Sequence, residues 1–297
     1  MRAGYGDFVS LDGTLVPASE ARVSVFDRGL LFAHAAYEVT AVMGGRLVDF
    51  DGHVRRLERT LAALAIPSAF TPSDWEAMHL DLLRANDLEE GIIYLQVTAG
   101  DYAGRDFAGP KELTPNIILF SEARRLIGEG AEKGVAAISC EDTRWSRRDL
   151  KTTQLLSQAL AYRAAGEAGV LTAIMHEAGL VTEAASANLW IVTAEGEIVT
   201  RDLSASILAG ITRGAVRGQA LKAGLSVVER AFTLEELAGA REAFTSSAGA
   251  LILPLVRIDG AEIGDGSPGP VTRRVQARYY DAIGIDVGRR APWASVF

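Results

Sequence analysis

The most telling run of this chain is Asp142-Thr143-Arg144-Trp145-Ser146-Arg147-Arg148-Asp149-Leu150-Lys151. It ends on a lysine in a chain that has only four lysines against twenty-six arginines. The other three, Lys111, Lys133 and Lys222, lie in loop, turn and helix-end contexts. Apolar residues at helical spacing follow Lys151 and predict a helix over 152–165. A lysine at such a junction, beside several arginines, is a candidate for Schiff-base chemistry.

The composition narrows the class of protein. At 297 residues, 48% of them apolar, the chain is long enough for two domains with sizeable cores. A net charge of −8 argues against a nucleic-acid-binding protein, which would show a basic balance or stripe. The single cysteine, Cys140, excludes an intrachain disulfide, fits a buried strand position and leads us to expect a cytoplasmic protein. Four scattered histidines give no metal-ligand spacing, and no apolar run is long enough to span a membrane.

The order of the patterns predicts an α+β fold in two domains. The elements expected in the first part are a hairpin at 8–17, strands at 37–43, 46–50, 91–98 and 116–120, and helices at 51–64 and 73–86. Neither part repeats a regular strand–helix–strand unit, so a doubly wound sheet is not expected. A polar stretch suggests a small N-terminal domain at 1–121, a linker at 122–130 and a larger C-terminal domain at 131–297. The loop at 99–115 is long enough to suggest a binding role.

Two turns of small residues in the second part suit an anion. The first, Ile207-Leu208-Ala209-Gly210-Ile211-Thr212-Arg213, precedes a helix, whose free N–H groups at Ile211 and Thr212 form a ready site. A plain N-cap by Thr212 is the alternative. The second, Thr245-Ser246-Ser247-Ala248-Gly249-Ala250, directly follows a strand and is otherwise a tight loop. Together with spare arginines, the two turns favour a cofactor that carries one phosphate.

Glu183 is a third feature, because it lies among small residues between two expected strands, in Val181-Thr182-Glu183-Ala184-Ala185-Ser186-Ala187-Asn188-Leu189-Trp190. A carboxylate that keeps a pyridine nitrogen protonated strengthens an electron sink. An ordinary turn acid is the alternative.

With these features together, the chain resembles the fold-type-IV pyridoxal-phosphate aminotransferases. These include D-amino-acid and branched-chain aminotransferases and (R)-selective amine transaminases. The matching segments run in family order over residues 5–280 and comprise 36–39, 53–57, 142–151, 182–188, 207–213 and 245–248. The likeness is greatest to the bacterial D-amino-acid aminotransferases, through 93–98 and 142–145. The resemblance implies a small α+β domain, a larger pseudobarrel domain, and a homodimer with active sites at its interface.

The resemblance also implies roles for single residues. Lys151 would form the internal aldimine with pyridoxal 5′-phosphate and shuttle a proton between the substrate Cα and C4′ of the cofactor. Glu183 would pair with the pyridine nitrogen, and Arg56 would bind the phosphate. The other cofactor contacts implied are Ser186, Leu208, Ile211, Thr212, Ser247 and Ala248. The substrate contacts implied are Tyr37, Val39, Arg105 and Phe107.

The long loop departs from the pattern of the D-amino-acid enzymes, which hold the substrate α-carboxylate with an Arg-x-His pair. Here Arg105 aligns with the arginine and Phe107 with the histidine, so a donor is replaced by apolar surface. Arg105 either binds the carboxylate or pairs with Asp106. Arg28 and His34 are an alternative trap, with a structural role as the simpler interpretation.

The function that follows is a transaminase moving an amino group between a D-amino acid and a 2-oxo acid in a ping-pong cycle. The alternatives within this fold are an (R)-selective amine:pyruvate transaminase, a branched-chain L-amino-acid transaminase and a lyase acting on aminodeoxychorismate. A different class is a non-catalytic protein that binds a phosphate ligand. The presence of both Lys151 and Glu183 argues against that class, since a binding relic is free to lose either.

Overall fold

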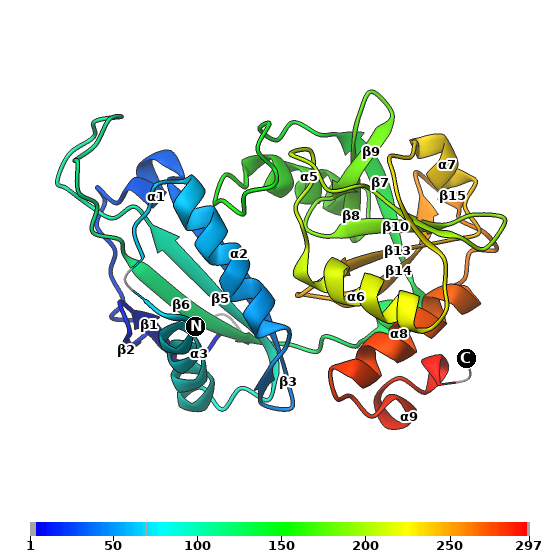
Figure 1. Ribbon diagram of the computed structural model, residues 1–297, viewed down its shortest axis with the longest axis horizontal. Coiled ribbons are helices and arrows are strands. Elements are labelled where there is room, and N and C mark those ends of the chain that lie inside the picture. The colour runs from blue at the N-terminus through cyan, green and yellow to red at the C-terminus, as the bar shows by residue number, and fades with distance from the viewer. Residues whose placement is uncertain (1–3, 69, 296–297) are drawn as a thin grey trace. The chain divides into compact units, whose positions relative to one another are not determined.

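The computed structural model of the chain describes residues 4–68 and 70–295, which belong to two compact units. Unit 1 comprises Met1–Arg125 with Leu150–Gln154, and unit 2 comprises Leu126–Asp149 with Leu155–Phe297. Each unit combines helices with a sheet (Figure 1), which confirms the predicted α+β class. The domain limits at 1–121, 122–130 and 131–297 stay a prediction, and they do not include the return of the chain to unit 1 at 150–154.

Unit 1 contains a six-stranded antiparallel sheet in the order β2-β1-β6-β5-β3-β4. Its strands are β1 (Phe8–Leu11), β2 (Thr14–Pro17), β3 (Ala35–Met43), β4 (Arg46–Leu47), β5 (Glu90–Thr98) and β6 (Ile117–Ala123). Its helices are α1 (Arg28–Phe32), α2 (Phe50–Ala63) and α3 (Pro72–Ala85), of which α2 lies along the sheet (Figure 1). The turn between β3 and β4 is Gly44-Gly45, both with positive φ, as a tight two-residue hairpin requires.

Local chemistry fixes the two long helices of unit 1. Thr71 and Asp74 form a reciprocal capping box at the start of α3, where Pro72 is the first helical residue. The buried stripe of α3 is Trp75, Met78, His79 and Leu82, at the spacing of one helix face. Together with Val54, Leu57 and Leu61 of α2, these side chains pack on the sheet and bury the core of the unit.

Unit 2 contains a nine-stranded mixed sheet in the order β12-β11-β10-β13-β14-β7-β8-β9, with β15 paired to β14. Its strands are β7 (Val135–Glu141), β8 (Thr172–Glu177), β9 (Leu180–Ala184), β10 (Asn188–Val192), β11 (Ile198–Thr200), β12 (Val227–Glu229), β13 (Glu242–Ser247), β14 (Leu251–Ile258) and β15 (Ala261–Glu262). Its helices are α4 (Glu129–Lys133), α5 (Leu156–Glu167), α6 (Ile211–Lys222), α7 (Leu234–Ala238), α8 (Pro270–Ala282) and α9 (Val287–Arg290), with the short 3₁₀ helix η1 (Pro292–Ala294). All residues of β10 are buried, which fits the apolar run that follows its first residue, Asn188.

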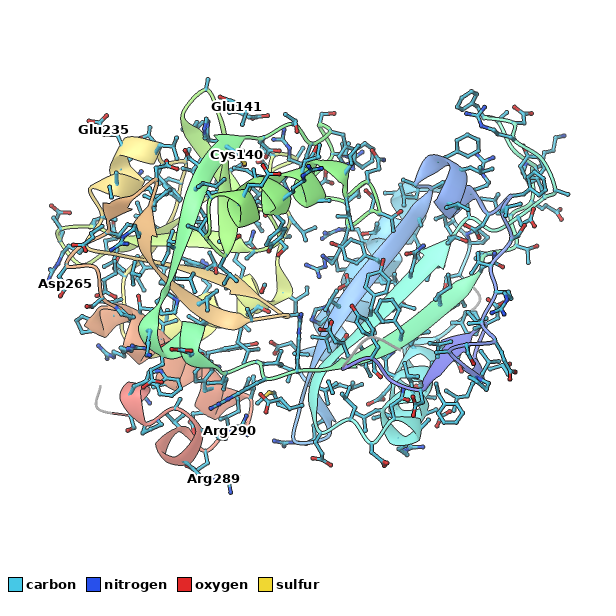
Figure 2. The ribbon with its side chains drawn as sticks, turned by 180° about the vertical axis from the view of Figure 1, so that it is seen from behind. Cys140, Glu141, Glu235, Asp265, Arg289 and Arg290 are labelled. Carbon is cyan, nitrogen blue, oxygen red and sulfur yellow. The ribbon has the colours of Figure 1, made fainter. Side chains whose placement is uncertain are left out.

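Some local expectations are wrong. The helix expected over 152–165 begins only at Leu156, because the chain before it is tied to the start of β3 by a bridge between Thr152 and Ala36 and a hydrogen bond from the N–H of Thr153 to the carbonyl of Ala35. The strand expected over 46–50 is limited to two residues, since α2 already begins at Phe50. Cys140 lies on β7 as expected (Figure 2) but is only half-buried, and its partial burial, with the nearby Asp142 carboxylate, raises the pKa of the thiol.

No helix in the described part of the chain is both long and apolar enough to cross a membrane.

Candidate active site

Lys151 is held in unit 1 by its backbone. Its carbonyl accepts a hydrogen bond of 3.0 Å from the N–H of Tyr37, and Thr152 forms an isolated bridge with Ala36. Its own N–H lies 3.5 Å from Oγ1 of Thr60 on α2. The segment around the lysine is therefore fixed against the start of β3, although it is not the start of a helix.

The side chain of Lys151 ends above an aromatic ring. Its Nζ lies 4.1 Å from the ring centroid of Tyr37, in a cation–π contact. Among residues 4–68 and 70–295, no carboxylate forms an ion pair with Lys151. The amine is thus held in place with no fixed carboxylate beside it. A carboxylate would stabilise the protonated form of the amine, which cannot act as a nucleophile. The structure brings together Lys151 and Tyr37, two of the residues selected from the sequence.

Tyr37 and Val39 alternate with Glu38 along β3, so they point to the opposite face of the sheet. Tyr37 stacks on Tyr94 of β5, with ring centroids 5.5 Å apart, and Tyr94 stacks in turn on Phe120. This row of rings fixes the orientation of Tyr37.

Arg56, on α2, is buried against Glu38. Its Nε donates to Oε1 of Glu38 at 2.8 Å, and its Nη2 donates to Oε2 at 2.7 Å. His53 Nδ1 lies 2.7 Å from the same Oε2. Burial alone would raise the pKa of Glu38, but the charge and hydrogen bonds of Arg56, with those of His53, hold it well below its usual range. The guanidinium of Arg56 is therefore oriented by the ionised carboxylate of Glu38. The sequence alone does not show this role of Glu38.

Arg105 and Phe107 lie in the exposed loop between β5 and β6. The Arg105 guanidinium is 5.3 Å from the ring centroid of Phe107 and 5.6 Å from that of Phe32. In the part of the chain that the structure describes, Arg105 forms no ion pair with Asp106, so its charge stays available to a ligand. Phe107 is 74% exposed, and its ring centroid lies 5.2 Å from that of Phe32.

Arg28 has a structural role. It is buried, and it donates 2.8 and 2.9 Å hydrogen bonds to the carbonyls of Asp106 and Phe107. Its Nε lies 3.4 Å from Nδ1 of His34. Because its donors are used on the backbone of the loop, Arg28 holds that loop in place, and the simpler interpretation from the sequence is supported.

Glu183 is the centre of a buried polar cluster in unit 2. It lies on β9, 4% exposed, and accepts a hydrogen bond from Arg144 and one of 2.9 Å from Nδ2 of Asn188. The N–H of Leu208 lies 3.3 Å from both carboxylate oxygens. Burial raises the pKa of Glu183, and the positive charge of Arg144 offsets that effect only in part. The alternative that Glu183 is an ordinary turn acid is therefore wrong.

Arg144 joins this cluster to a second buried acid. Its Nε and Nη2 donate to the two oxygens of Asp142 at 2.9 and 2.6 Å, while its Nη1 donates to Glu183. Thr182 donates to Asp142 as well, at 2.7 Å. Burial would raise the pKa of Asp142, but these donors hold it lower. From the sequence, Asp142 and Arg144 are visible only as part of a motif, because nothing in the run shows which charges pair.

The first small-residue turn ends in an open helix terminus. The N-cap of α6 is Gly210, not Thr212, and it makes no side-chain capping bond, so the plain-cap alternative is wrong. A side chain at Gly210 would bring Cβ within 2.0 Å of Oδ1 of Asn188, so only glycine fits there. The N–H groups of Ile211 and Thr212 at this terminus suit an anion.

The second turn lies at the same end of the same sheet. In the antiparallel pair β10–β13, Asn188 is opposite Ser246, so the start of β10 lies beside the end of β13. Ser247 is the last residue of β13, and Ala248 follows it in the turn to β14. Ser186, in the turn between β9 and β10, is exposed and hydrogen-bonded to Tyr162 of α5. Register thus places the Ser247-Ala248 turn beside Asn188, whose amide also contacts Glu183 and the carbonyl of Leu208.

Comparison with known proteins gives consistent matches over nearly the whole chain. Residues 35–258 match the family described as "Amino-transferase class IV". A D-alanine aminotransferase of Bacillus licheniformis is 35% identical over 275 residues, which cover 93% of this chain and 96% of the relative. A D-alanine aminotransferase of Staphylococcus haemolyticus is 34% identical, with 90% and 95% covered.

Solved structures of branched-chain amino acid aminotransferases share the fold. The Escherichia coli protein aligns with a TM-score of 0.85 at 24% identity, covering 94% of this chain and 95% of that one. The Thermobaculum terrenum protein, solved in its PLP-form, aligns with a TM-score of 0.82 at 25% identity, covering 97% of each chain. The fold-type-IV architecture expected from the sequence is confirmed. The chain belongs to the class IV aminotransferases.

Proposed function

We propose that this aminotransferase moves an amino group between a D-amino acid and a 2-oxo acid, with pyridoxal 5′-phosphate as its cofactor, in a ping-pong cycle. The curated relatives named D-alanine aminotransferase support the substrate class. The observation that carries the chemistry is the Lys151 amine, fixed over Tyr37 at 4.1 Å and free of any carboxylate among the described residues.

The residues present fit the cofactor. A phosphate ester needs cationic and N–H donors, which Arg56, the open terminus at Ile211 and Thr212, and the Ser247-Ala248 turn provide. A pyridine nitrogen that carries a proton needs a carboxylate, and Glu183 is buried and directed by three donors. Bound pyridoxal phosphate supplies an aldehyde that condenses with amines and a ring that takes up electrons.

Lys151 has two tasks in this proposal. Its Nζ would hold the cofactor between turnovers, and its free amine would take up the proton from the substrate Cα during turnover. A defined position is essential because the proton must leave and return on one face. The hydrogen bonds that hold the backbone of Lys151 to Tyr37 and Thr60 support that position.

Glu183 holds the proton of the ring nitrogen. A carboxylate with a raised pKa shares a proton strongly with a pyridine nitrogen. Asn188 and the N–H of Leu208 keep its oxygens in one orientation. Leu208 and Ser186 complete the proposed cofactor contacts.

Tyr37, Val39, Arg105 and Phe107 are the proposed substrate contacts. Arg105 has the positive charge that an α-carboxylate needs, and Phe107 adds an apolar surface beside it. The apolar surface of Phe107 by itself also suits an (R)-amine, which has no carboxylate, and this substrate is the alternative. The branched-chain alternative is supported only by the names of the solved structures that share the fold.

A homodimer acting in the cytoplasm is part of the proposal. Leu30 of unit 1 is 69% exposed and Leu156 of unit 2 is 73% exposed, and a second copy of the chain would cover such side chains. Light scattering of the purified protein distinguishes a dimer from a monomer.

A half-reaction tests the substrate class. The protein is loaded with cofactor and mixed separately with D-alanine, L-leucine and (R)-1-phenylethylamine, and the absorption band of the bound aldehyde is followed. We expect D-alanine to remove the band. Loss chiefly with the (R)-amine or only with L-leucine would replace the proposed substrate, and a protein that never acquires a band would be a non-catalytic binder.

A further inference from the structure

Trp190, on β10, contacts both of the segments in unit 2 to which we assign the cofactor phosphate. Its side chain is fully buried, and its indole N–H donates a 2.9 Å hydrogen bond to Oγ of Ser246, the residue before the last one of β13. Its ring centroid is 5.8 Å from the guanidinium carbon of Arg213, which lies in the first turn of α6. One buried side chain therefore connects the end of β13 with the helix terminus.

Strand register places the Ser246 hydroxyl on the face of the sheet that meets the start of α6. Asn188 lies directly opposite Ser246 in the antiparallel pair, and opposite residues project to the same face. On that face Nδ2 of Asn188 donates to the carbonyl oxygen of Leu208 at 2.9 Å, and a Cβ at Gly210 would lie 2.0 Å from its Oδ1. Helix α6 itself packs beside β13 (Figure 1). Ser247 alternates to the other face, so Ser246 is the serine whose hydroxyl shares a face with the helix terminus.

The hydrogen bond from Trp190 determines what the Ser246 hydroxyl can do. An indole N–H can only donate, so Oγ of Ser246 is the acceptor and its own O–H is left to donate elsewhere. Among residues 4–68 and 70–295, the side chain of Ser246 makes no other hydrogen bond. Ser246 is only 2% exposed, and a buried donor in a folded protein almost always has an acceptor. An anion at the open terminus of α6 would provide one.

Arg213 holds the other contact of Trp190 in place. It is buried, and its Nη2 donates to the carbonyl oxygen of Arg201 at 2.7 Å and to Oε1 of Glu229 at 2.6 Å. Arg201 follows β11 and Glu229 is the last residue of β12, so these bonds tie the first turn of α6 to the sheet. The helix terminus therefore keeps its place relative to the indole.

We propose that Trp190 is a positioning residue for the cofactor phosphate and acts through Ser246. Its N–H fixes the rotation of the Ser246 hydroxyl, so that the hydroxyl proton is available to a phosphate oxygen. Phe244 holds the indole plane, because the two rings stack with centroids 5.6 Å apart and an angle of 9° between them. The inference rests on the proposed function, which assigns the phosphate to this part of unit 2.

Trp190→Phe is the primary test, because phenylalanine keeps an aromatic ring beside Phe244 and removes the N–H. The probes are pyridoxine 5′-phosphate and pyridoxine, which differ only in the phosphate, and their dissociation constants for the cofactor-free protein are measured by calorimetry. Neither probe has an aldehyde, so their binding does not require a covalent bond to Lys151. We expect the preference for the phosphate ester, given by the ratio of the two constants, to fall about tenfold, as for one hydrogen bond to a charged oxygen.

The ratio separates a positioning role from a structural one. If Trp190 only supports the fold, Trp190→Phe weakens the binding of both probes equally, and an unchanged ratio overturns the inference. A wild-type protein with no preference for the phosphate ester overturns it as well. The half-reaction with D-alanine tests the transaminase separately, because its signal comes from the aldehyde bound at Lys151.

Ser246→Ala is a second test that leaves the large side chain in place. It should lower the preference for the phosphate ester by about the same factor of ten, since it removes the hydroxyl itself. Adding Trp190→Phe to Ser246→Ala should cause no further loss, because both changes remove the same interaction. Losses that add in the double variant would contradict an action through Ser246.

Trp75→Phe is the matched control. Trp75 is 1% exposed in the core of unit 1, and its indole N–H has no hydrogen-bond partner in the described part of the chain. This variant loses the same atoms from a buried site far from the helix terminus in the sequence, and its preference for the phosphate ester should equal that of wild type. A fall as large as in Trp190→Phe would assign the effect to a general loss of packing and overturn the inference.

Discussion

Glu38 and Arg56 form a doubly hydrogen-bonded ion pair inside unit 1, with side-chain exposures of 2% and 5%. Glu38 belongs to β3 and Arg56 to α2, so the pair connects a strand to the helix that packs on it. Removing one partner of a buried pair leaves the other as an uncompensated charge, which costs more than the pair contributes. The pair therefore fixes the guanidinium to which we assign the phosphate.

Glu38→Gln should lower the stability of the protein by about 3 kcal/mol. An amide keeps the volume but turns one acceptor into a donor that faces Arg56. The folded-state pKa of Glu38 is depressed, so its stabilisation is present above the unfolded value near 4.5 and is lost as the pH falls through the folded value. The loss of unfolding free energy in Glu38→Gln relative to wild type should thus be largest at neutral pH and should shrink in acid. Thermal unfolding at several pH values measures this difference.

Asp81→Asn is the control for this change, because the Asp81–Arg84 pair is exposed on α3. We expect a change of no more than about 0.5 kcal/mol. Equal effects of the two substitutions would show that the buried pair does not stabilise the unit.

Lys151→Ala should abolish the absorption band of the bound aldehyde and reduce turnover by at least about 10³-fold. The amine is the only group we assign to both covalent binding and proton transfer. Lys133→Ala is the control, since Lys133 is exposed and paired with Glu129, and its removal should leave both quantities unchanged. Survival of the band and of turnover in Lys151→Ala would sink the Schiff-base assignment.

Arg144→Leu should destabilise the protein by about 3–5 kcal/mol at neutral pH and by less near pH 5. Arg144 is the cation shared by Asp142 and Glu183, so its loss raises the pKa of both acids. An acid with a raised folded pKa holds its proton longer in the folded state, and stability then falls as the pH rises above the unfolded value near 4.5. Thermal midpoints at the two pH values measure this difference.

Arg163→Leu is the comparison for this variant, because the Arg163–Glu167 pair is exposed on α5 and should show no such pH dependence. A loss in Arg144→Leu that is the same at both pH values would mean that Arg144 acts through packing and not through charge.

The sequence predicted individual elements well where one local rule is decisive. The helix expected over 73–86 is α3, Pro72–Ala85, because Pro72 and the capping box of Thr71 and Asp74 mark its start. The expectation failed at 152–155, because Thr152 bridges to Ala36 and the N–H of Thr153 donates to Ala35, more than a hundred residues earlier, so that the helix begins only at Leu156. Such a pairing has no signal within the segment itself.

The candidate site was also predictable only in part, where a sequence motif marks the residue. Motif order selected Lys151, Glu183 and Arg56, yet it gave no role to Glu38, Arg144 or Asn188. Their partners lie between two and thirty-nine residues away at no regular spacing, so only the packed structure shows which side chains they contact. Glu38 had a weak signal as the single charged residue in the run of β3.

Phe107→His should raise kcat/KM for D-alanine relative to (R)-1-phenylethylamine by about tenfold, because a histidine beside Arg105 adds a donor for the carboxylate. Phe107 is 74% exposed, so its replacement should not change stability. Phe107→Leu keeps the apolar character and should leave the ratio as it is. An unchanged ratio in Phe107→His would place the carboxylate away from this loop.

The stability of the protein should fall as the pH decreases from 6.5 to 4, with His79 contributing on the order of 3 kcal/mol to that fall. Burial lowers the folded pKa of His79 to about 4, while the unfolded side chain titrates near 6.5. Between these values the unfolded chain binds a proton that the folded one refuses, so stability is complete above 6.5 and is lost toward 4. Urea unfolding across this range should show the slope in wild type, and His79→Gln and His79→Phe should both flatten it. The two variants separate charge from hydrogen bonding, because only glutamine can still donate a hydrogen bond to the carbonyl oxygen of Trp75, which His79 contacts at 2.7 Å. Equal flattening with a lower stability for His79→Phe throughout is the expected pattern, whereas a slope that persists in both variants would assign the acid sensitivity to other groups.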